Sequence, residues 1–263
     1  MRIAIHGAAG RMGRRLVALG HDDPDLTVVA TVEYEGHPEI GADAGLLAGV
    51  GKLGVVLSSK LETEVDAVIE FSVPNGAESI TKTCVAQRVP LVMATTGLSE
   101  NQRALVSQAS NTIPVVWAPN MSLAVNLTMQ LAQIAARALR DHSSGADVEI
   151  IERHHRFKED APSGTALRFG EIIAKAMGQT GTTHGRQGRP GARPRDEIAY
   201  HAVRAGDNPG EHTIVFGLLG EMIEVRVAST SRDCYAQGAL AAAKFLAAKP
   251  PGMYSMNDVL GFG

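Results

Sequence analysis

Residues 2–13 read RIAIHGAAGRMG, and this stretch passes from an apolar strand through a glycine-rich turn into a helix. Gly7 permits the tight turn, Gly10 lets the backbone approach a ligand, and Gly13 lets the helix pack closely on the strand. The spacing is GxxGxxG rather than GxGxxG, but the strand, turn and helix that the motif requires are all present in the pattern. We therefore predict that this turn binds the phosphates of a dinucleotide.

A second apolar strand is predicted over Thr27–Glu33, and it ends in a carboxylate. Glu33 follows Gly13 by about 20 residues, where a dinucleotide-binding fold places the acidic residue that accepts hydrogen bonds from the adenosine ribose. The alternative is an ordinary solvated glutamate at a strand end. The glycine turn upstream favours the ribose-binding role.

Three further strands alternate with helical patterns, over Asp66–Ser72, Pro90–Ala94 and Ile113–Trp117. Their nearly continuous apolar character is typical of parallel strands that helices cover on both faces, so we predict an α/β domain with a Rossmann-like sheet. Small or polar residues follow each strand, and the carboxyl ends of parallel strands form the edge where such a sheet binds its ligand. A nicotinamide dinucleotide is the leading candidate, ahead of flavin or ATP, because the chain contains no GK[ST] phosphate loop.

The pattern changes after residue 122. A long amphipathic helix is predicted from Leu123 to about Arg140, and a strand over Val148–His154 follows it. Strands that alternate polar and apolar residues come later, and turn sequences between them favour antiparallel hairpins. These strands are predicted over Glu197–Ala205, Glu211–Phe216 and Glu221–Ser229.

We therefore predict two domains: a dinucleotide-binding domain over residues 1–122, and an α+β domain with a mixed or antiparallel sheet over residues 123–232, for substrate binding and oligomerisation. The last predicted helix, Tyr235–Ala247, brings residues 233–263 back to the first domain. One face of the second sheet is expected to lie free of helices. Apolar side chains on that face would favour self-association.

Residues 152–165 read ERHHRFKEDAPSGT and combine two histidines and a lysine with a predicted helix start. Ser163 is a good N-cap for a helix that continues to Met177. We expect the backbone N–H groups of Gly164 and Thr165 to be available to a carboxylate or phosphate, beside a cluster of cations. An acidic small molecule is therefore the predicted substrate.

The segment Gly178–Arg195 is rich in Gly, Arg, Thr and Pro and shows no apolar periodicity. We predict a mobile surface loop here. Its arginines could indicate a polyanionic partner, but arginines diluted by glycines on an acidic chain are more often solvated.

Composition limits the remaining classes of function. The chain has 263 residues, with 25 basic and 28 acidic side chains and a net charge of -3, so we predict neither nucleic-acid nor membrane binding. No apolar run reaches the roughly 20 residues that span a bilayer, and no signal peptide is evident, so a cytoplasmic location is expected. Cys84 and Cys234 are predicted to be reduced thiols. No metal site is predicted.

The residues above resemble the dihydrodipicolinate reductase family over nearly the full length of the chain. The resemblance rests on Gly7–Gly13, Glu70–Ser72, Thr95–Gly97, Ala118–Ser122, Val203–Asp207 and, most specifically, the pattern HHRxKxDAPSGTA that begins at His154. It implies a tetrameric enzyme of lysine and diaminopimelate synthesis that reduces 4-hydroxy-tetrahydrodipicolinate with NADH or NADPH.

The resemblance also implies roles for the histidine segment. His154 and Lys158 would handle the proton, and His155, Gly164 and Thr165 would bind the substrate carboxylates. The chemistry agrees, because hydride addition to a conjugated imine leaves negative charge that a cationic or protonated side chain must neutralise. Which of His154 and Lys158 delivers the proton stays open.

The glycine turn, the strand ends and the family pattern together predict the residues that contact the cofactor. These are Gly7, Ala8, Ala9, Gly10, Arg11, Met12, Glu33, Phe71, Ala94, Thr95, Thr96, Ala118, Pro119, Asn120 and Met121.

Two positions depart from the residues that are common in the family. Tyr34 stands where many members carry an arginine that reaches the extra phosphate of NADPH, and a phenol does not replace a guanidinium there. We therefore predict that NADH is used at least as well as NADPH, unless Arg11 supplies the missing cation. Ala94 stands where a glycine is common, which affects only the closeness of that backbone contact.

Two other functions remain open from the sequence. One is a different nicotinamide-dependent oxidoreductase with the same cofactor domain, such as an amino-acid dehydrogenase. The other is a dinucleotide-binding protein without catalytic activity. The histidines and the lysine of residues 154–158 favour an enzyme over the second alternative.

Overall fold

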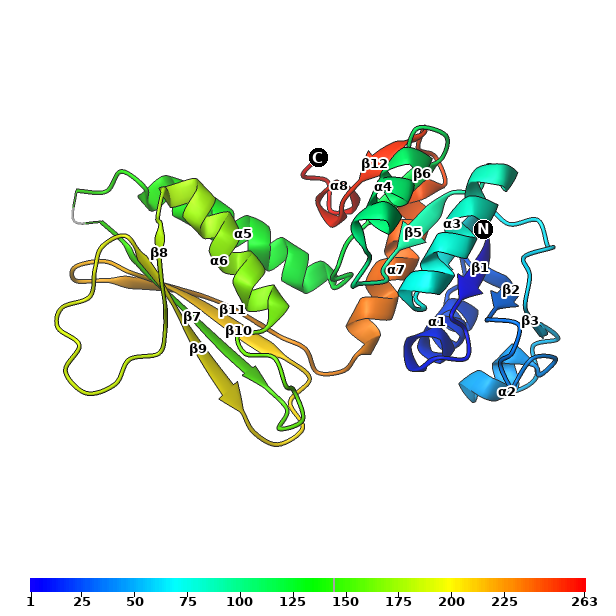
Figure 1. Ribbon diagram of the computed structural model, residues 1–263, viewed down its shortest axis with the longest axis horizontal. Helices are drawn as coiled ribbons and strands as arrows, with labels where there is room; N and C mark the ends of the chain where they lie inside the picture. The colour runs from blue at the N-terminus through cyan, green and yellow to red at the C-terminus, as the bar shows by residue number, and fades with distance from the viewer. Residues whose placement is uncertain (144) are drawn as a thin grey trace. The chain divides into compact units, whose positions relative to one another are not determined.

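The computed structural model describes residues 1–143 and 145–263, which form two compact units (Figure 1). The first unit comprises Met1–Leu123 and Asp233–Gly263, and the second comprises Ala124–Arg232.

The first unit is built on a seven-stranded sheet in which every strand pairing is parallel. The order is β12-β6-β5-β4-β1-β2-β3, so the direction in which the chain adds strands reverses between β1 and β4. The strands are β1 (Arg2–His6), β2 (Thr27–Val32), β3 (Leu57–Ser58), β4 (Ala67–Glu70), β5 (Leu91–Met93), β6 (Pro114–Trp117) and β12 (Gly252–Tyr254). The predicted Rossmann-like sheet is confirmed.

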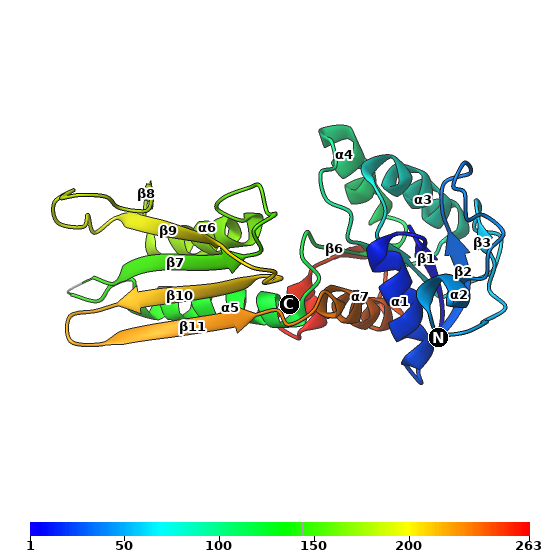
Figure 2. The same ribbon diagram turned by 90° about the horizontal axis from the view of Figure 1, so that it is seen from below.

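Helices cover both faces of this sheet, as its nearly continuous apolar strands require (Figure 2). Successive side chains of a strand point to opposite faces, so Ile3 and Ile5 join one core with α1 and α7 while Ala4 joins the other with α3 and α4. The helices are α1 (Arg11–Asp22), α2 (Ala44–Ala48), α3 (Pro74–Gln87), α4 (Glu100–Ala109), α7 (Asp233–Leu246) and α8 (Met256–Val259). The last long helix, α7, packs beside α1 in the core of the first unit.

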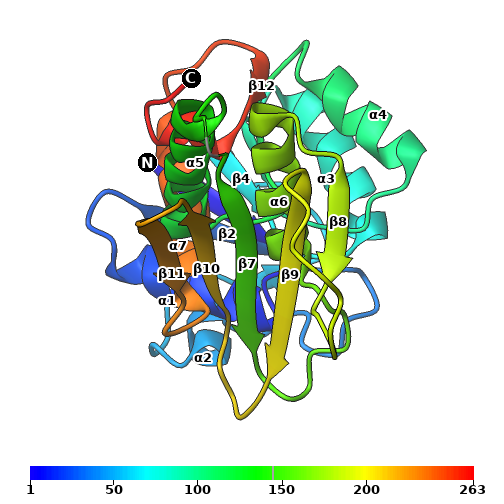
Figure 3. The same cartoon turned by 90° about the vertical axis from the view of Figure 1, so that its left-hand side faces the viewer.

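The second unit contains a mixed five-stranded sheet in the order β11-β10-β7-β9-β8 (Figure 3). β7 pairs with β9, and β8 with β9, in parallel; the pairs β7–β10 and β10–β11 are antiparallel. The strands are β7 (Asp147–His154), β8 (Gly181–His184), β9 (Glu197–Arg204), β10 (Glu211–Gly217) and β11 (Met222–Ala228).

One predicted hairpin is wrong. β10 and β11 form a hairpin, but β9 does not pair with β10, because β7 lies between them. The connection from β9 to β10 instead crosses the end of β7 and bonds to it. The N–H of Ala205 donates to the carbonyl of His154 (3.0 Å), and the N–H of His155 donates to the carbonyl of Asn208 (2.8 Å). These bonds replace those that a hairpin would have made.

Two helices, α5 (Leu123–Leu139) and α6 (Gly164–Met177), cover one face of this sheet (Figures 1 and 2). Val148 and Ile150 of β7 point toward them and share a core with Phe169 and Ile173 of α6. The residues between them in β7 point to the face that no helix of the unit covers in these views. β7 therefore presents Glu152 and His154 toward α6.

The uncovered face of the second sheet carries ion pairs beside apolar side chains, among them Ile151, Val203 and Met222. Glu149 of β7 accepts hydrogen bonds from Arg186 (2.9 Å), Arg193 (2.9 Å) and His201 (2.6 Å). Glu211 of β10 pairs with two arginines of the neighbouring strands in the same way.

The predicted loop Gly178–Arg195 is therefore wrong in two respects. Its first part forms β8, which pairs with the edge of β9. Arg186 and Arg193 are held by Glu149 and Glu197 of the sheet rather than solvated. The sequence carries no apolar period here because ion pairs, not a buried stripe, attach the segment.

The Glu149 cluster should make stability depend on pH. Burial alone would raise the pKa of Glu149, but hydrogen bonds from Arg186, Arg193 and His201 outweigh it and lower the pKa to about 2. A pKa below the unfolded value of 4.5 stabilises the fold above that pH, and this contribution is lost as the pH falls toward 2. We expect Glu149→Gln to reduce the fall in unfolding free energy between pH 5 and 3, measured by urea denaturation. Glu171→Gln, which changes an exposed glutamate of α6, should leave that fall unchanged.

Candidate active site

The residues predicted to contact the cofactor lie along the carboxyl ends of strands in the first unit. We call them the cofactor edge: Gly7–Met12, Glu33, Phe71, Ala94–Thr96 and Ala118–Met121. They follow β1, β2, β4, β5 and β6, which are neighbours in one parallel sheet. This edge contains the point between β1 and β4 where open α/β sheets bind ligands.

The glycine turn is constrained by backbone on two sides. The φ of Gly7 is 78°, and a Cβ there would lie 2.8 Å from the carbonyl oxygen of Phe71. A Cβ on Gly13 would lie 2.1 Å from the carbonyl oxygen of Gly7. α1 begins at Arg11 after Gly10, which brings no side chain to its N-terminus. The start of α1 is thus open to an anion of the size of a phosphate.

Glu33 lies directly beside this turn. Its carboxylate accepts hydrogen bonds from the N–H of Ala9 (3.3 Å) and of Tyr34 (3.2 Å). Tyr34 is 61% exposed and contacts the ring of His37 edge-on. Arg14 is bound to both carboxylate oxygens of Glu39. Arg14 also donates to the carbonyl of Ala9 (2.8 Å), so the guanidinium near the turn is already paired.

Several residues of the cofactor edge can offer only backbone atoms to a ligand. Met121 is 1% exposed, and its side chain belongs to the core of the first unit. Thr95 is also buried, and its hydroxyl donates to Glu70 (2.7 Å). The exposed members Arg11 and Thr96 can offer side chains.

A buried glutamate, Glu70, to which the sequence analysis gave no role of its own, supports this edge. Glu70 ends β4, is fully buried, and bonds to the imidazole of His6 at the end of β1. It also accepts hydrogen bonds from the N–H (2.8 Å) and the hydroxyl (2.5 Å) of Ser72. A carboxylate at the end of an otherwise apolar strand was the signal for this role.

In the second unit, the structure brings the predicted substrate residues to the end of β7 and the start of α6. We call them the substrate cluster: His154, His155, Lys158, Gly164 and Thr165. His154 ends β7 and is buried on the face toward α6, whereas His155 is half-buried. Ser163 caps α6, as predicted, by accepting a hydrogen bond from the N–H of Ala166 (3.1 Å).

Lys158 lies in the turn between β7 and α6. Its side chain is 22% exposed, and its ammonium group donates to the carboxylate of Asp160 (2.7 Å). Burial lowers the pKa of His154, Glu152 opposes this effect, and the charges of Lys158 and Arg204 add to it. A neutral imidazole therefore lies close to a lysine ammonium group.

Three residues that the sequence analysis did not assign hold this cluster: Glu152, Arg204 and His212. Glu152 is fully buried and binds His154, Ser163 and Arg204. The ring of His212 meets that of His154 edge-on at 5.2 Å, and its Nε2 lies 2.9 Å from the hydroxyl of Ser163. Burial lowers the pKa of His212 to about 4, with a further contribution from His154, so this ring is neutral near pH 7.

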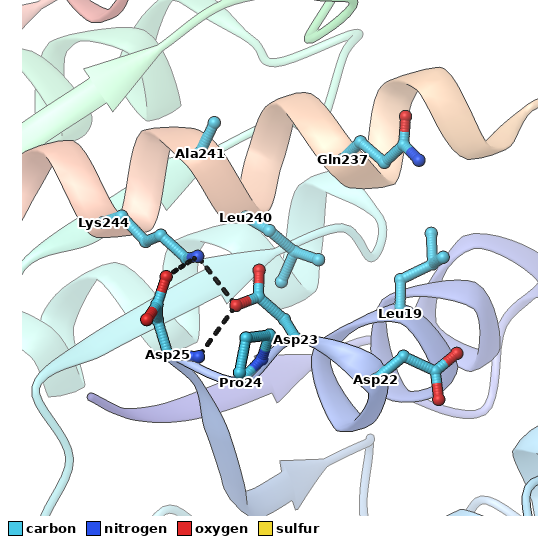
Figure 4. A pocket seen from close by; sticks show the side chains of 9 residues that line it. All are labelled: Leu19, Asp22, Asp23, Pro24, Asp25, Gln237, Leu240, Ala241 and Lys244. Atoms are coloured by element: carbon cyan, nitrogen blue, oxygen red, sulfur yellow. Dashed lines mark hydrogen bonds and ion pairs between the residues drawn. The ribbon is translucent and has the colours of Figure 1, made fainter.

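One pocket of about 430 Å³ lies at the opposite end of α1 from the glycine turn (Figure 4). Lys244 of α7 bridges Asp23 (2.7 Å) and Asp25 (2.9 Å) at its wall. Among the described residues that line it, none belongs to the cofactor edge or the substrate cluster.

Two features are missing from the part of the chain that the structure describes. No group of three or more His, Cys, Asp or Glu side chains there is arranged to hold a metal ion. No helix there has the length and apolar character that crossing a membrane requires.

Two family models match the chain in succession. The model described as "Dihydrodipicolinate reductase, N-terminus" matches residues 1–121, and the model described as "Dihydrodipicolinate reductase, C-terminus" matches residues 124–260. Together they cover both compact units.

Relatives with curated names are similar over the whole chain. A 4-hydroxy-tetrahydrodipicolinate reductase of Rhodopirellula baltica is 55% identical over 98% of this chain and 95% of its own length. The enzyme of the same name from Alkalilimnicola ehrlichii is 45% identical over 99% of this chain and 98% of its own.

Solved structures share the fold at low sequence identity. A dipicolinate-bound dihydrodipicolinate reductase from Paenisporosarcina sp. TG-14 matches with a TM-score of 0.77 at 24% identity, covering 97% of each chain. An amine dehydrogenase from Mycobacterium smegmatis matches with a TM-score of 0.62 at 13% identity, covering 98% of this chain and 95% of its own.

Proposed function

The chain belongs to the dihydrodipicolinate reductase family, and from this premise we propose how its residues divide the work of the reaction. It is an oxidoreductase that reduces 4-hydroxy-tetrahydrodipicolinate in lysine biosynthesis, and its family uses NAD(P)H. The observation that carries this function is the identity of up to 55% over nearly the full length of the curated relatives. It favours the reductase over another dehydrogenase and over a protein without activity.

The first unit, with residues 233–263, is the proposed dinucleotide-binding domain. The start of α1 would hold the pyrophosphate and Glu33 the adenosine ribose, since both lie at the glycine turn. The remaining residues of the cofactor edge would border the nicotinamide. When bound, the nicotinamide supplies the hydride. The chain supplies the binding, the orientation and the proton.

The second unit is the proposed substrate domain. His155 and the first amides of α6, at Gly164 and Thr165, would hold the two carboxylates, because a helix start and an imidazole favour anions. Oriented in this way, the ring would need little further ordering before reaction. His154 and Lys158 would neutralise the negative charge that hydride addition leaves on the ring.

The activity is tested directly by absorbance. Purified protein, NADH and the product of condensing pyruvate with aspartate semialdehyde are mixed, and the loss of NADH absorbance is followed. We expect a rate proportional to enzyme concentration. A rate no higher than that of the enzyme-free mixture would contradict the function.

The choice of cofactor is a further proposal. Tyr34 cannot recognise the extra phosphate of NADPH by charge, and Arg14 is already paired with Glu39. We expect kcat/KM with NADH to equal or exceed that with NADPH. Tyr34→Arg should raise kcat/KM for NADPH by roughly tenfold, and Tyr34→Phe should leave the ratio unchanged. A strong preference of the unaltered enzyme for NADPH would point to Arg11 as the phosphate ligand.

We also propose a homotetramer, on the strength of the family resemblance alone, with no nucleic-acid or membrane partner. Light scattering should give four times 27.7 kDa. Cys84 and Cys234 form no disulfide with each other, which fits the proposed cytoplasmic location.

A further inference from the structure

We propose that Glu152, neutralised by Arg204, is the positioning residue of the substrate cluster: it fixes which ring nitrogen of His154 exchanges a proton, and it holds the start of α6. This inference rests on the proposed roles of His154 and of the α6 start. It assigns a function to a carboxylate that is fully buried and that touches neither substrate nor cofactor in the roles given above.

Four donors surround the two carboxylate oxygens of Glu152. One oxygen accepts from the N–H of Ser163 (3.1 Å) and from a guanidinium N–H of Arg204 (2.7 Å). The other accepts from Arg204 again (2.7 Å) and lies 2.6 Å from Nδ1 of His154. Because an ionised carboxylate can only accept, Nδ1 must carry the proton. Glu152 therefore selects the tautomer of His154.

This choice leaves Nε2 as the working atom of His154. Nδ1 keeps its hydrogen on Glu152 whether the ring is neutral or charged, so any proton that the ring gains or loses is bound at Nε2. Gly210 leaves room beside that atom, since a Cβ there would lie 2.9 Å from Nε2. The residue just before β10, which approaches the imidazole, is therefore one without a side chain.

Arg204 extends the same support to the rest of the cluster. It pairs with Glu152 through two hydrogen bonds and also donates to the backbone carbonyl of Asp160 (2.6 Å). The carboxylate of Asp160 binds Lys158. Through Ser163, Glu152 also holds the residue that caps α6. One buried pair is therefore connected to both proton-handling side chains and to the proposed carboxylate-binding helix start.

The test is Glu152→Gln, a change that preserves shape but replaces one acceptor oxygen with a donor. The amide cannot accept from all four groups. The orientation with the fewest conflicts turns its NH₂ toward His154, because an imidazole can move its hydrogen to Nε2 whereas Ser163 N–H and Arg204 cannot become acceptors. We therefore expect His154 to change from the Nδ1–H to the Nε2–H tautomer.

The tautomer can be read by solid-state ¹⁵N NMR of histidine-labelled protein without substrate, with His154 assigned by comparison with His154→Asn. The matched control is Glu149→Gln. Glu149 lies on the same strand and also binds arginines and a histidine, but it points to the opposite face. Its replacement should leave both the His154 signal and kcat as in the unaltered enzyme.

We expect Glu152→Gln to change the His154 tautomer, to lower kcat by at least tenfold and to leave the affinity for NADH unchanged. An unchanged tautomer, or a kcat that falls by less than tenfold, would overturn it. If the Glu152→Gln variant does not fold, the double variant Glu152→Gln/Arg204→Met, which removes both charges, takes its place. The same results are expected of it, and the same results would overturn the proposal. The NMR measurement of the tautomer needs no substrate. It therefore remains valid even if the unaltered protein shows no activity in the NADH assay, because that assay tests only the proposed function.

Discussion

Lys158→Ala is expected to lower kcat by roughly 10²–10⁴-fold, the usual contribution of a positioned proton donor. Asp160 holds the ammonium group of Lys158 near the buried ring of His154. Replacement by alanine removes this flexible cation from the site. NADH affinity should not change, because the cofactor edge belongs to the other unit. Steady-state kinetics and a fluorescence titration with NADH would measure the two quantities.

Lys82→Ala is the control for this variant. Lys82 forms an exposed ion pair with Glu78 on α3 and has no proposed role in catalysis, so kcat should stay unchanged. A Lys158→Ala enzyme with a rate near that of the unaltered protein would remove Lys158 from the mechanism and leave proton transfer to His154.

Arg204→Met should be the most destabilising of the changes considered. It leaves the fully buried carboxylate of Glu152 without its cation, and breaking a buried pair on one side typically costs about 3–5 kcal/mol. In urea denaturation followed by circular dichroism, the midpoint of unfolding of the second unit should shift clearly to a lower urea concentration.

Arg226→Met provides the matched comparison. Arg226 is more than half exposed, and Arg153 still pairs with Glu211 after the change, so we expect a much smaller loss of unfolding free energy than for Arg204→Met. If Arg204→Met and Arg226→Met lowered the unfolding free energy equally, the Glu152–Arg204 pair would be no more important to the fold than a surface ion pair.

The two units place a buried glutamate behind their proposed binding edges in a similar way. Glu70 ends β4 and binds His6 and Ser72; Glu152 lies near the end of β7 and binds His154 and Ser163. In both cases the carboxylate accepts a backbone N–H from the segment that follows the strand. A buried acceptor thus ties the connection that follows the strand to the end of that strand.

The parts of the fold that local pattern determines could be predicted from sequence. The apolar runs at residues 67–69 and 91–93 indicated buried parallel strands, and Ser163 indicated the start of α6. These signals arise from burial on both strand faces and from a cap within three residues, so they are visible in a short window.

The parts that failed depend on contacts between distant residues. Nothing near Glu197 indicates that β9 pairs with β7 rather than β10, since that choice is made by bonds across the end of β7. Glu152 and Arg204 are 52 residues apart, so their pairing has no local pattern. β12 and α8 are too short to show a period.

The most direct test of the account is a crystal structure with NADH and a pyridine dicarboxylate bound. We expect the carboxylates within hydrogen-bond distance of His155, Gly164 and Thr165, with the ring nitrogen facing His154 or Lys158 and the nicotinamide at the cofactor edge. A dicarboxylate bound away from the substrate cluster would contradict the assignment of this segment as the substrate site.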